Sequence, residues 1–309
     1  MNSGKPGLAA IIARPGLQAT DHPPAGAGPE RKSRHMLELE QAGFDWPDGS
    51  RQLQDISLTL AAGECAALVG ANGAGKSTLL RLACGLLRPG SGRVRLAGVD
   101  TREARPPALA RLAGLMFQEP ERQICHARVD LEVGFAPRLA GGTAADIRHR
   151  VDEALALTGL EAMARAHPLD LDAGARRMVT LASLIAQAPG LLLLDEPTRD
   201  LDAVWLARFE RWLEHARHQG QAVLMISHDL DFVARHASRV LHLAEHRLVA
   251  DGPPERVLAD PRLQSLDELP APTLPALGRG LGMQPVSQPE AFAAQWDASW
   301  QDRQNGRTA

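Results

Sequence analysis

The sequence contains no tyrosine, and aromatic residues make up only 4% of its 309 residues. Proteins that bind single-stranded nucleic acid stack the bases on aromatic side chains, so this scarcity argues against such a surface. The formal net charge of −3 also provides no general attraction for a polyanion. We therefore expect no nucleic acid among the partners of this chain.

Cysteine is scarce as well, and long apolar runs are missing. Cys65, Cys84 and Cys125 form no C-x-x-C pair, which argues against a disulfide framework or a zinc knuckle and fits a reducing compartment. No apolar run approaches the ~18 residues of a membrane-spanning helix. The apolar residues 8–13 are too few for a signal peptide. Any membrane role is expected to be peripheral.

Composition divides the chain into three parts. Residues 1–35 are rich in Pro, Gly and Ala and are predicted to be a disordered extension, with Met36 as an alternative start. Residues 36–270 carry the patterned segments of one large domain. Residues 271–309, where Pro, Gly and Gln recur, are predicted to be a C-terminal appendage.

The apolar pattern of the middle part predicts an α/β fold. Residues 36–40 and 56–60 alternate as half-buried strands do, around a turn at residues 46–49. Short, continuous apolar runs predict strands of a parallel sheet buried on both faces, at residues 65–69, 115–117, 191–194 and 223–226. Helices are predicted at residues 77–87, 145–166 and 173–188. The last two follow each other without a strand, so a helical insertion is expected at about residues 119–180.

Residues 70–78 read G-A-N-G-A-G-K-S-T and fit the phosphate-binding pattern G-x-x-x-x-G-K-[ST]. The pattern lies between a predicted buried strand and a predicted helix, as its mechanism requires, because backbone N–H groups and the helix N-terminus then face the phosphates. Lys76 is expected to reach the β- and γ-phosphates, and Ser77 to hold Mg²⁺. The predicted nucleotide-binding residues of this P-loop are Gly70, Asn72, Gly73, Gly75, Lys76, Ser77 and Thr78.

Two carboxylates follow the apolar run 191–194. Asp195 is suited to the Mg²⁺ shell, and Glu196 to orienting or deprotonating an attacking water. On its own this pattern is weak, because helix N-caps often look like it. Downstream of a P-loop it indicates ATP hydrolysis with Mg²⁺.

From about residue 36 to 269 the chain resembles an ABC ATPase, a P-loop NTPase with a mixed sheet core and a helical subdomain. The resemblance implies that Trp46 stacks on adenine and that Gln118 senses Mg²⁺ and the membrane partner. It implies that Glu196 is the catalytic base and that His228 contacts the γ-phosphate. Asp202 matches the D-loop, which crosses the interface between two ATPase domains.

Three further segments, residues 44–49, 117–123 and 249–254, are similar to energy-coupling-factor ATPases, as is the Pro- and Leu-rich stretch 269–281. This resemblance implies a peripheral motor on the cytoplasmic face of the membrane for import of a vitamin or a transition-metal ion. It also implies three partners: a second ABC ATPase subunit, a transmembrane coupling protein and a substrate-binding membrane protein.

The family signature Leu-Ser-Gly-Gly-Gln, which completes the partner's ATP site, is degenerate here. The aligned residues are Leu171, Asp172, Ala173, Gly174 and Ala175. Asp caps a helix as well as Ser does, but an ionised carboxylate cannot donate a hydrogen bond to the γ-phosphate. Losing one such donor costs ~3–4 kcal/mol of transition-state stabilisation. A like charge at ~4 Å adds about 4 kcal/mol at an effective dielectric near ~20.

We therefore expect a heterodimer, because a homodimer would carry two impaired sites. Arg176 or Arg177 is a candidate to neutralise Asp172. Two alternatives stay open: a regulatory subunit that binds nucleotide with weak ATPase activity, and the motor of another ABC transporter class, including an exporter. One P-loop and no sustained heptads argue against ABC proteins that act on ribosomes or DNA.

Overall fold

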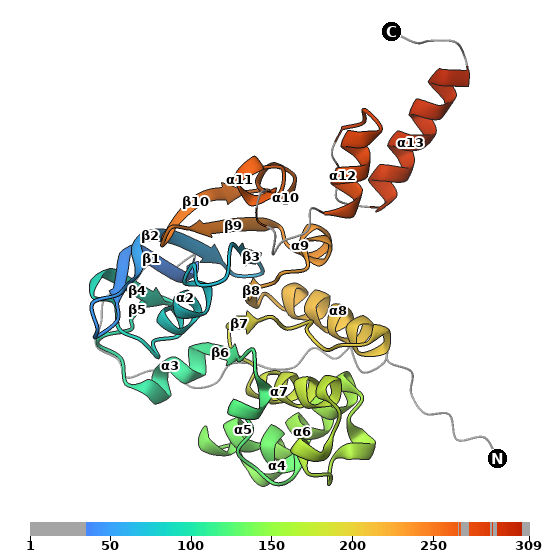
Figure 1. The fold of residues 1–309 in the computed structure, drawn as a ribbon. Coiled ribbons are helices and arrows are strands. Elements are labelled where there is room, and N and C mark those ends of the chain that lie inside the picture. The colour runs from blue at the N-terminus through green and yellow to red at the C-terminus, as the bar shows by residue number, and fades with distance from the viewer. Residues whose placement is uncertain (1–34, 265, 267–271, 285, 287–288, 305–309) are drawn as a thin grey trace, which may run out of the picture. The chain divides into compact units, whose positions relative to one another are not determined.

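The computed structural model describes residues 35–264, 266, 272–284, 286 and 289–304, which Figure 1 draws as a ribbon. The predicted N-terminal extension, apart from His35, lies outside these residues. The boundaries of the three predicted parts stay predictions.

The larger of two sheets runs in the order β10-β9-β3-β8-β7-β6. Pairing is parallel from β9 to β6, and β10 adds an antiparallel edge. Its strands are β3 (Cys65–Val69), β6 (Ala113–Met116), β7 (Leu191–Asp195), β8 (Ala222–Ile226), β9 (Arg239–Ala244) and β10 (Arg247–Gly252). All residues of β3, β7 and β8 are buried, which confirms these predicted strands.

The smaller sheet is antiparallel, with the order β2-β1-β4-β5. Its strands are β1 (His35–Asp45), β2 (Arg51–Ala61), β4 (Ser91–Leu96) and β5 (Val99–Asp100). The predicted turn at residues 46–49 joins β1 to β2. Gly49 has a φ of 83° there and its N–H donates to the carbonyl of Trp46, a backbone conformation that favours glycine.

Helices follow the strands of the larger sheet, and a group of helices separates β6 from β7. The helices among the described residues 35–236 are α2 (Lys76–Ala83), α3 (Pro106–Leu112), α4 (Val129–Val133), α5 (Phe135–Leu139), α6 (Ala144–Thr158), α7 (Ala173–Gln187), α8 (Ala203–His218) and α9 (Leu230–His236). Short 3₁₀ turns lie at η1 (Pro120–Arg122), η2 (Glu161–Met163) and η3 (Pro168–Asp170). No strand interrupts the described residues between β6 and β7.

Two predicted helices are shorter than the sequence pattern indicated. The predicted helix 77–87 ends at Ala83, and Gly85 follows with a φ of 76°. The predicted helix 145–166 ends at Thr158, where Gly159 has a φ of 73°. Left-handed glycines end helices because they lack the steric cost of a Cβ atom.

The last helices are α10 (Pro254–Val257), α11 (Pro261–Gln264), α12 (Thr273–Gly280) and α13 (Pro289–Gln304). The N–H and hydroxyl of Thr273 donate to the carboxylate of Asp231, which connects α12 to α9. Among the described residues, no helix has the length and hydrophobicity needed to cross a membrane.

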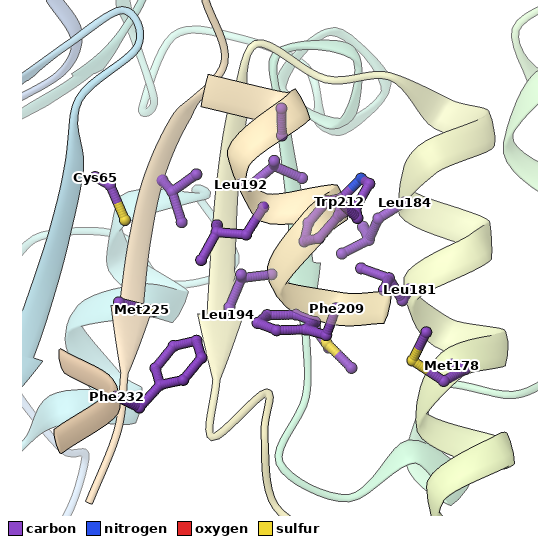
Figure 2. Packing of buried hydrophobic residues seen from close by; sticks show 14 of the residues in the cluster. Cys65, Met178, Leu181, Leu184, Leu192, Leu194, Phe209, Trp212, Met225 and Phe232 are labelled. Carbon is purple, nitrogen blue, oxygen red and sulfur yellow. The ribbon is translucent and has the colours of Figure 1, made fainter. Parts of the chain in front are cut away.

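Successive side chains of the larger sheet point to opposite faces and pack into two separate hydrophobic cores. Ala66 and Leu68 of β3 face α2 and the smaller sheet, whereas Ala67 and Val69 face α7, α8 and α9. Figure 2 shows the second core, where Phe209 and Trp212 of α8 meet strands β7 and β8. Phe209 is fully buried, with its ring centroid 5.5 Å from that of Trp212 and 6.0 Å from that of Phe232. It therefore packs α8 and α9 against one face of the larger sheet.

We predict that Phe209→Ala lowers the free energy of unfolding by about 3–5 kcal/mol, because it leaves a cavity between α8 and α9. Phe135→Ala is the matched control: Phe135 is 39% exposed, and its truncation should cost less than about 1 kcal/mol. Urea denaturation followed by circular dichroism measures both. Equal losses in the two variants would contradict this account of the core.

Candidate nucleotide-binding and catalytic site

The parallel register of the larger sheet brings the predicted site residues to one edge. Asp195 at the end of β7 lies opposite Ile226 at the end of β8, and Leu68 of β3 also pairs with Ile226. The carboxyl ends of parallel strands meet at the same edge, which is where ligands bind in open α/β sheets. The loops that follow β3, β7 and β8 therefore converge.

Glycines let the P-loop lie tightly against the neighbouring strands. Gly70 has a φ of 149°, and a Cβ atom there would lie 2.1 Å from the carbonyl oxygen of Leu243. Gly75 has a φ of 105°, and its Cβ would lie 2.7 Å from the carbonyl oxygen of Gln52. Both positions thus require glycine on steric grounds. Gly73, with a φ of 79° and open space around it, requires glycine for its conformation alone.

Lys76 lies inside this loop. Its Nζ donates to the carbonyls of Gly70 and Ala71 at 2.7 and 2.9 Å, and the residue is only 8% exposed. Thr78 is buried in the first turn of α2, and Asn72 lies at the exposed tip of the loop. The loop thus presents a cation and the first N–H groups of α2 on one side, which suits polyphosphate.

Ser77 and Asp195 are the residues predicted to hold a magnesium ion. The hydroxyl of Ser77 lies near enough to the carboxyl of Asp195 to lower its pKa, so two hard oxygen groups of the kind that Mg²⁺ prefers lie close together. Burial raises the pKa of Asp195, against the lowering effect of the Ser77 hydroxyl. A cation would offset the cost of this buried carboxylate, so the residues fit the ion. Among the described residues there is no cluster of three or more His, Cys, Asp and Glu that would suit another metal.

Glu196 and His228 come from neighbouring strand ends and face each other. The Nε2 atom of His228 lies 3.4 Å from a carboxylate oxygen of Glu196. Glu196 has a φ of 51°, an unfavourable conformation for a non-glycine residue that costs about 1 kcal/mol or more. Its N–H donates to the carbonyl of Ile226, which ties this turn to the end of β8. The geometry can place a carboxylate base and an imidazole beside one reacting group.

Trp46 is connected to the P-loop through a residue that sequence reasoning missed. Its indole N–H donates to Gln52 Oε1 at 3.1 Å, and Gln52 Nε2 donates to the carbonyl of Gly73 at 3.3 Å. Phe44 packs edge-on against the indole, with ring centroids 5.0 Å apart. Gln52 lies in the alternating strand β2, so its pattern alone indicated only a solvent-facing position. Adenine stacking on Trp46 stays a prediction.

The degenerate signature forms the start of α7. Asp172 is its N-cap, accepting the N–H of Ala175 at 2.8 Å, and both Asp172 and Ala173 are exposed. Gly174 is buried, and a Cβ atom there would lie 2.8 Å from Trp205. Leu171 packs partly buried against the second core, and Ala175 is fully buried. The segment therefore keeps a sound helix start without the donor of the family signature.

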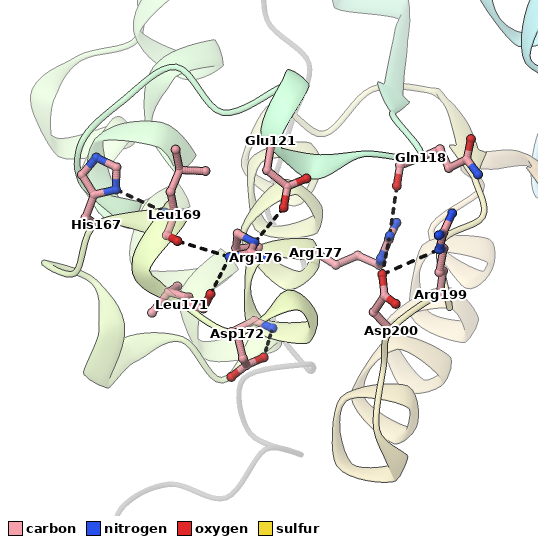
Figure 3. Close-up of polar contacts among 11 residues, drawn as sticks. Gln118, Glu121, His167, Leu169, Leu171, Asp172, Arg176, Arg177, Arg199 and Asp200 are labelled. Atoms are coloured by element: carbon pink, nitrogen blue, oxygen red, sulfur yellow. Dashed lines mark hydrogen bonds and ion pairs between the residues drawn. The ribbon is translucent and has the colours of Figure 1, made fainter.

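Arg176 and Arg177 do not neutralise Asp172, contrary to the expectation from the sequence. Arg176 forms an ion pair with Glu121, with 2.9 Å between the charged atoms, and Arg177 lies 3.4 Å from Asp200. Figure 3 shows the two side chains leaving α7 toward opposite sides. Within the part of the chain that the structure describes, Asp172 has no ion pair with a basic residue.

Gln118 and Asp202 occupy loops beside the site. Met116 at the end of β6 pairs with Leu194 of β7. Gln118 lies two residues after Met116, and Glu196 lies two residues after Leu194, so the two residues follow neighbouring strands at matching positions. The carboxylate of Asp202 caps α8 through the N–H groups of Val204 and Trp205, at 2.9 and 2.8 Å. Its proposed part in a dimer interface stays a prediction.

Comparison with known proteins decides the family. Residues 53–199 match the family described as ABC transporter. The chain is 36% identical over 226 residues to the cobalt import ATP-binding protein CbiO of Syntrophus aciditrophicus, and the aligned region covers 72% of this chain and 80% of that protein. The chain belongs to the ABC transporter ATP-binding proteins. The predicted fold class and the predicted ATPase activity are thereby confirmed.

Other relatives of this ABC ATPase bear on the narrower similarity to energy-coupling-factor ATPases that the sequence predicts. The energy-coupling factor transporter ATP-binding protein EcfA2 of Methanospirillum hungatei is 32% identical over 256 residues, 82% of this chain and 64% of that protein. CbiO1 of Clostridium perfringens, described as part of the transporter complex CbiONQ, superposes with a TM-score of 0.68 at 29% identity, covering 81% and 100% of the two chains. A dimeric bacterial ABC transporter cassette shares the fold, with a TM-score of 0.64 at 24% identity over 71% and 98%. The resemblance to energy-coupling-factor ATPases is confirmed.

Arg177 is a second residue whose contacts sequence reasoning missed. It is 1% exposed and donates to the carbonyls of Gln118 and Glu196 at 3.0 and 3.2 Å. A signal was present, because Arg177 falls three residues after Gly174 and four before Leu181, on the buried side of α7. A charged residue on an apolar stripe requires partners.

The buried carboxylate predicts a pH-dependent stability difference. Because the pKa of Asp195 is raised in the folded protein, the protonated carboxyl stabilises the fold. This stabilisation is fully present below the ordinary pKa of aspartate and is lost as the pH rises through the raised pKa. Asp195→Asn should therefore raise the melting temperature of the nucleotide-free, Mg²⁺-free protein at about pH 8, with a smaller gain at about pH 5. Thermal scans in a chelator test this. A variant less stable than wild type at both pH values would contradict the cause given for the pKa shift.

Proposed function

We propose that this ABC ATPase is the motor subunit of an energy-coupling-factor-type importer for a vitamin or a transition-metal ion. The observation that carries the proposal is the contact of Glu196 with His228 beside the Ser77–Asp195 pair. Relatives named for cobalt import and for an energy-coupling factor support the transporter class. The cargo class rests on this likeness alone.

In the proposed reaction the P-loop binds ATP, and Mg²⁺ supplies charge neutralisation at the phosphates when it is bound. Lys76 would contact the β- and γ-phosphates once they displace its present carbonyl partners. Glu196 would orient and deprotonate the attacking water, and His228 would hold the γ-phosphate. Gln118 would join the ion's oxygen shell beside Ser77 and Asp195.

We further propose that the chain works in an asymmetric pair. A cassette of the same fold is dimeric, and in the proposed pair each signature completes the other subunit's site. Asp172 is exposed at the start of α7, and both following arginines are engaged elsewhere. Its uncompensated charge would impair the partner's site, whereas an intact partner signature would complete the site built on Glu196.

The remaining partners follow from the same class. A transmembrane coupling protein and a substrate-binding membrane protein would place the chain at the cytoplasmic face of the membrane. The description of CbiO1 as part of a multi-component transporter supports this assembly. A regulatory subunit with weak ATPase activity is the second candidate, and Asp172 is the observation that favours it. ATPase rates with and without the membrane partner separate motor from regulator.

Glu196→Gln removes the proposed base while keeping the size of the side chain. We predict a loss of about 10²–10⁴-fold in ATP turnover, with binding of ATP retained and the membrane partners co-purified. Phosphate release and equilibrium nucleotide binding measure the two effects. Glu210→Gln is the matched control, because Glu210 pairs with Arg235 and His236, away from the strand ends. Equal turnover in Glu196→Gln and wild type would remove Glu196 from the mechanism.

Asp172→Ser should raise the ATP turnover of the chain purified alone by about tenfold or more, since one such donor accounts for roughly 10²-fold in rate. Serine also caps the helix, so the melting temperature should stay close to that of wild type. Asp170→Ser is the control, because it removes the same charge from the exposed 3₁₀ turn η3 without placing a hydroxyl in the signature. A wild-type chain that already turns over as fast as Asp172→Ser would sink the asymmetric pair.

A further inference from the structure

Arg177 brings three loops of the site together. Its Nη1 donates to the carbonyl of Glu196 at 3.2 Å, and its Nη2 donates to the carbonyl of Gln118 at 3.0 Å. The same Nη2 lies 3.4 Å from a carboxylate oxygen of Asp200. Figure 3 shows this side chain reaching from α7 to Gln118 and Asp200. One guanidinium thus joins the loop after β6, the turn after β7 and the segment before α8.

The Arg177 side chain that makes these contacts is buried, whereas the Asp200 side chain is 47% exposed. Arg177 is 1% exposed, and burial lowers its pKa against the raising effect of Asp200. An unpaired charge at this depth would be strongly unfavourable, so the carbonyls and the carboxylate are needed to hold it. The buried guanidinium therefore needs these acceptors, and the loops that provide them are held together by the same hydrogen bonds.

Two of the connected residues have strained backbones. Glu196 and Asp200 have φ values of 51° and 62°. The carbonyl of Glu196 also accepts the N–H of Arg199 at 3.2 Å, so it is the acceptor that closes the turn behind the carboxylate. Strained positions persist only where surrounding contacts hold them. Arg177 provides such a contact from outside the turn.

We propose that Arg177 is a positioning residue for ATP hydrolysis, which holds the Glu196 turn in register with the Gln118 loop. The inference rests on the proposed role of Glu196 as the base. It assigns to α7 a second task beside the degenerate signature: the helix braces the ATP site of its own chain from within. Arg176 leaves the same helix toward Glu121 and the carbonyls of Leu169 and Leu171, so it does not share this task.

Lysine cannot replace Arg177 in this task. The planar guanidinium offers donors in a fixed fork, and here the two Nη atoms serve acceptors from different loops. A lysine ammonium carries the same charge as a single point, so it would reach one loop at a time. Methionine matches the buried stem and removes all donors.

The test compares Arg177→Met and Arg177→Lys with wild type by hydrogen–deuterium exchange and by kinetics. Peptides covering residues 117–123 and 196–202 should exchange faster in Arg177→Met, while residues 65–83 stay unchanged. Turnover should fall by about 10²-fold, the effect of misplacing a catalytic group by roughly 1 Å. The Kd of a non-hydrolysable ATP analogue with Mg²⁺ should change by no more than about twofold. The turnover and exchange rates of Arg177→Lys should lie between those of wild type and Arg177→Met. If Arg177→Met does not fold, Arg177→Lys alone is compared with wild type.

Arg208→Met is the control. Arg208 donates to the carbonyl of Thr158 and lies over the ring of Trp205, so its loss should destabilise the α6–α8 contact and leave kcat unchanged. Wild-type turnover in the Arg177 variants, or exchange that rises equally in residues 65–83, would overturn the proposal. Absence of turnover in wild type and Asp172→Ser alike would instead refute the proposed function, and the exchange measurement would still decide on Arg177.

Discussion

The rest of the structure depends on the register between neighbouring parallel strands. Because Asp195 lies opposite Ile226, the two strands end together, and Glu196, one residue after β7, and His228, two residues after β8, emerge at the same edge of the sheet. The same pairing brings the end of β3, and with it the P-loop, to this edge. A shift of one residue would turn every side chain of a strand to the other face. Both hydrophobic cores therefore fix the geometry of the site.

Buried charge is the second constraint on this protein. Lys76, Asp195 and Arg177 are all less than a tenth exposed, and each is held by groups that belong to the site. Lys76 is held by loop carbonyls, Asp195 by Ser77, and Arg177 by the loops it connects. Low-dielectric surroundings strengthen such contacts and penalise an unpaired group. In the ATP site, the contacts that stabilise these buried charges are consequently also the contacts that position the site residues.

Sequence reasoning predicted strands β3, β6, β7 and β8 and the P-loop, because continuous apolar runs and a spaced motif are local signals. It did not predict β9 and β10 of the same sheet. It overestimated two helices, since the left-handed glycines Gly85 and Gly159 end them without interrupting the apolar pattern. The bridge from Trp46 through Gln52 to Gly73 joins residues of two separate loops and a strand, and no pattern in the sequence encodes that contact. The engagement of both arginines away from Asp172 was missed for the same reason: partners across loops are set by tertiary packing.

The signature segment keeps a glycine at position 174 and has aspartate at position 172, where the family signature has serine. Gly174 is held by the approach of Trp205, and the capping position accepts aspartate as readily as serine. Folding alone therefore accounts for the residues at both positions. A signature segment can therefore look partly intact because of the fold alone, so its outline at the start of α7 is no measure of what it does for a second subunit.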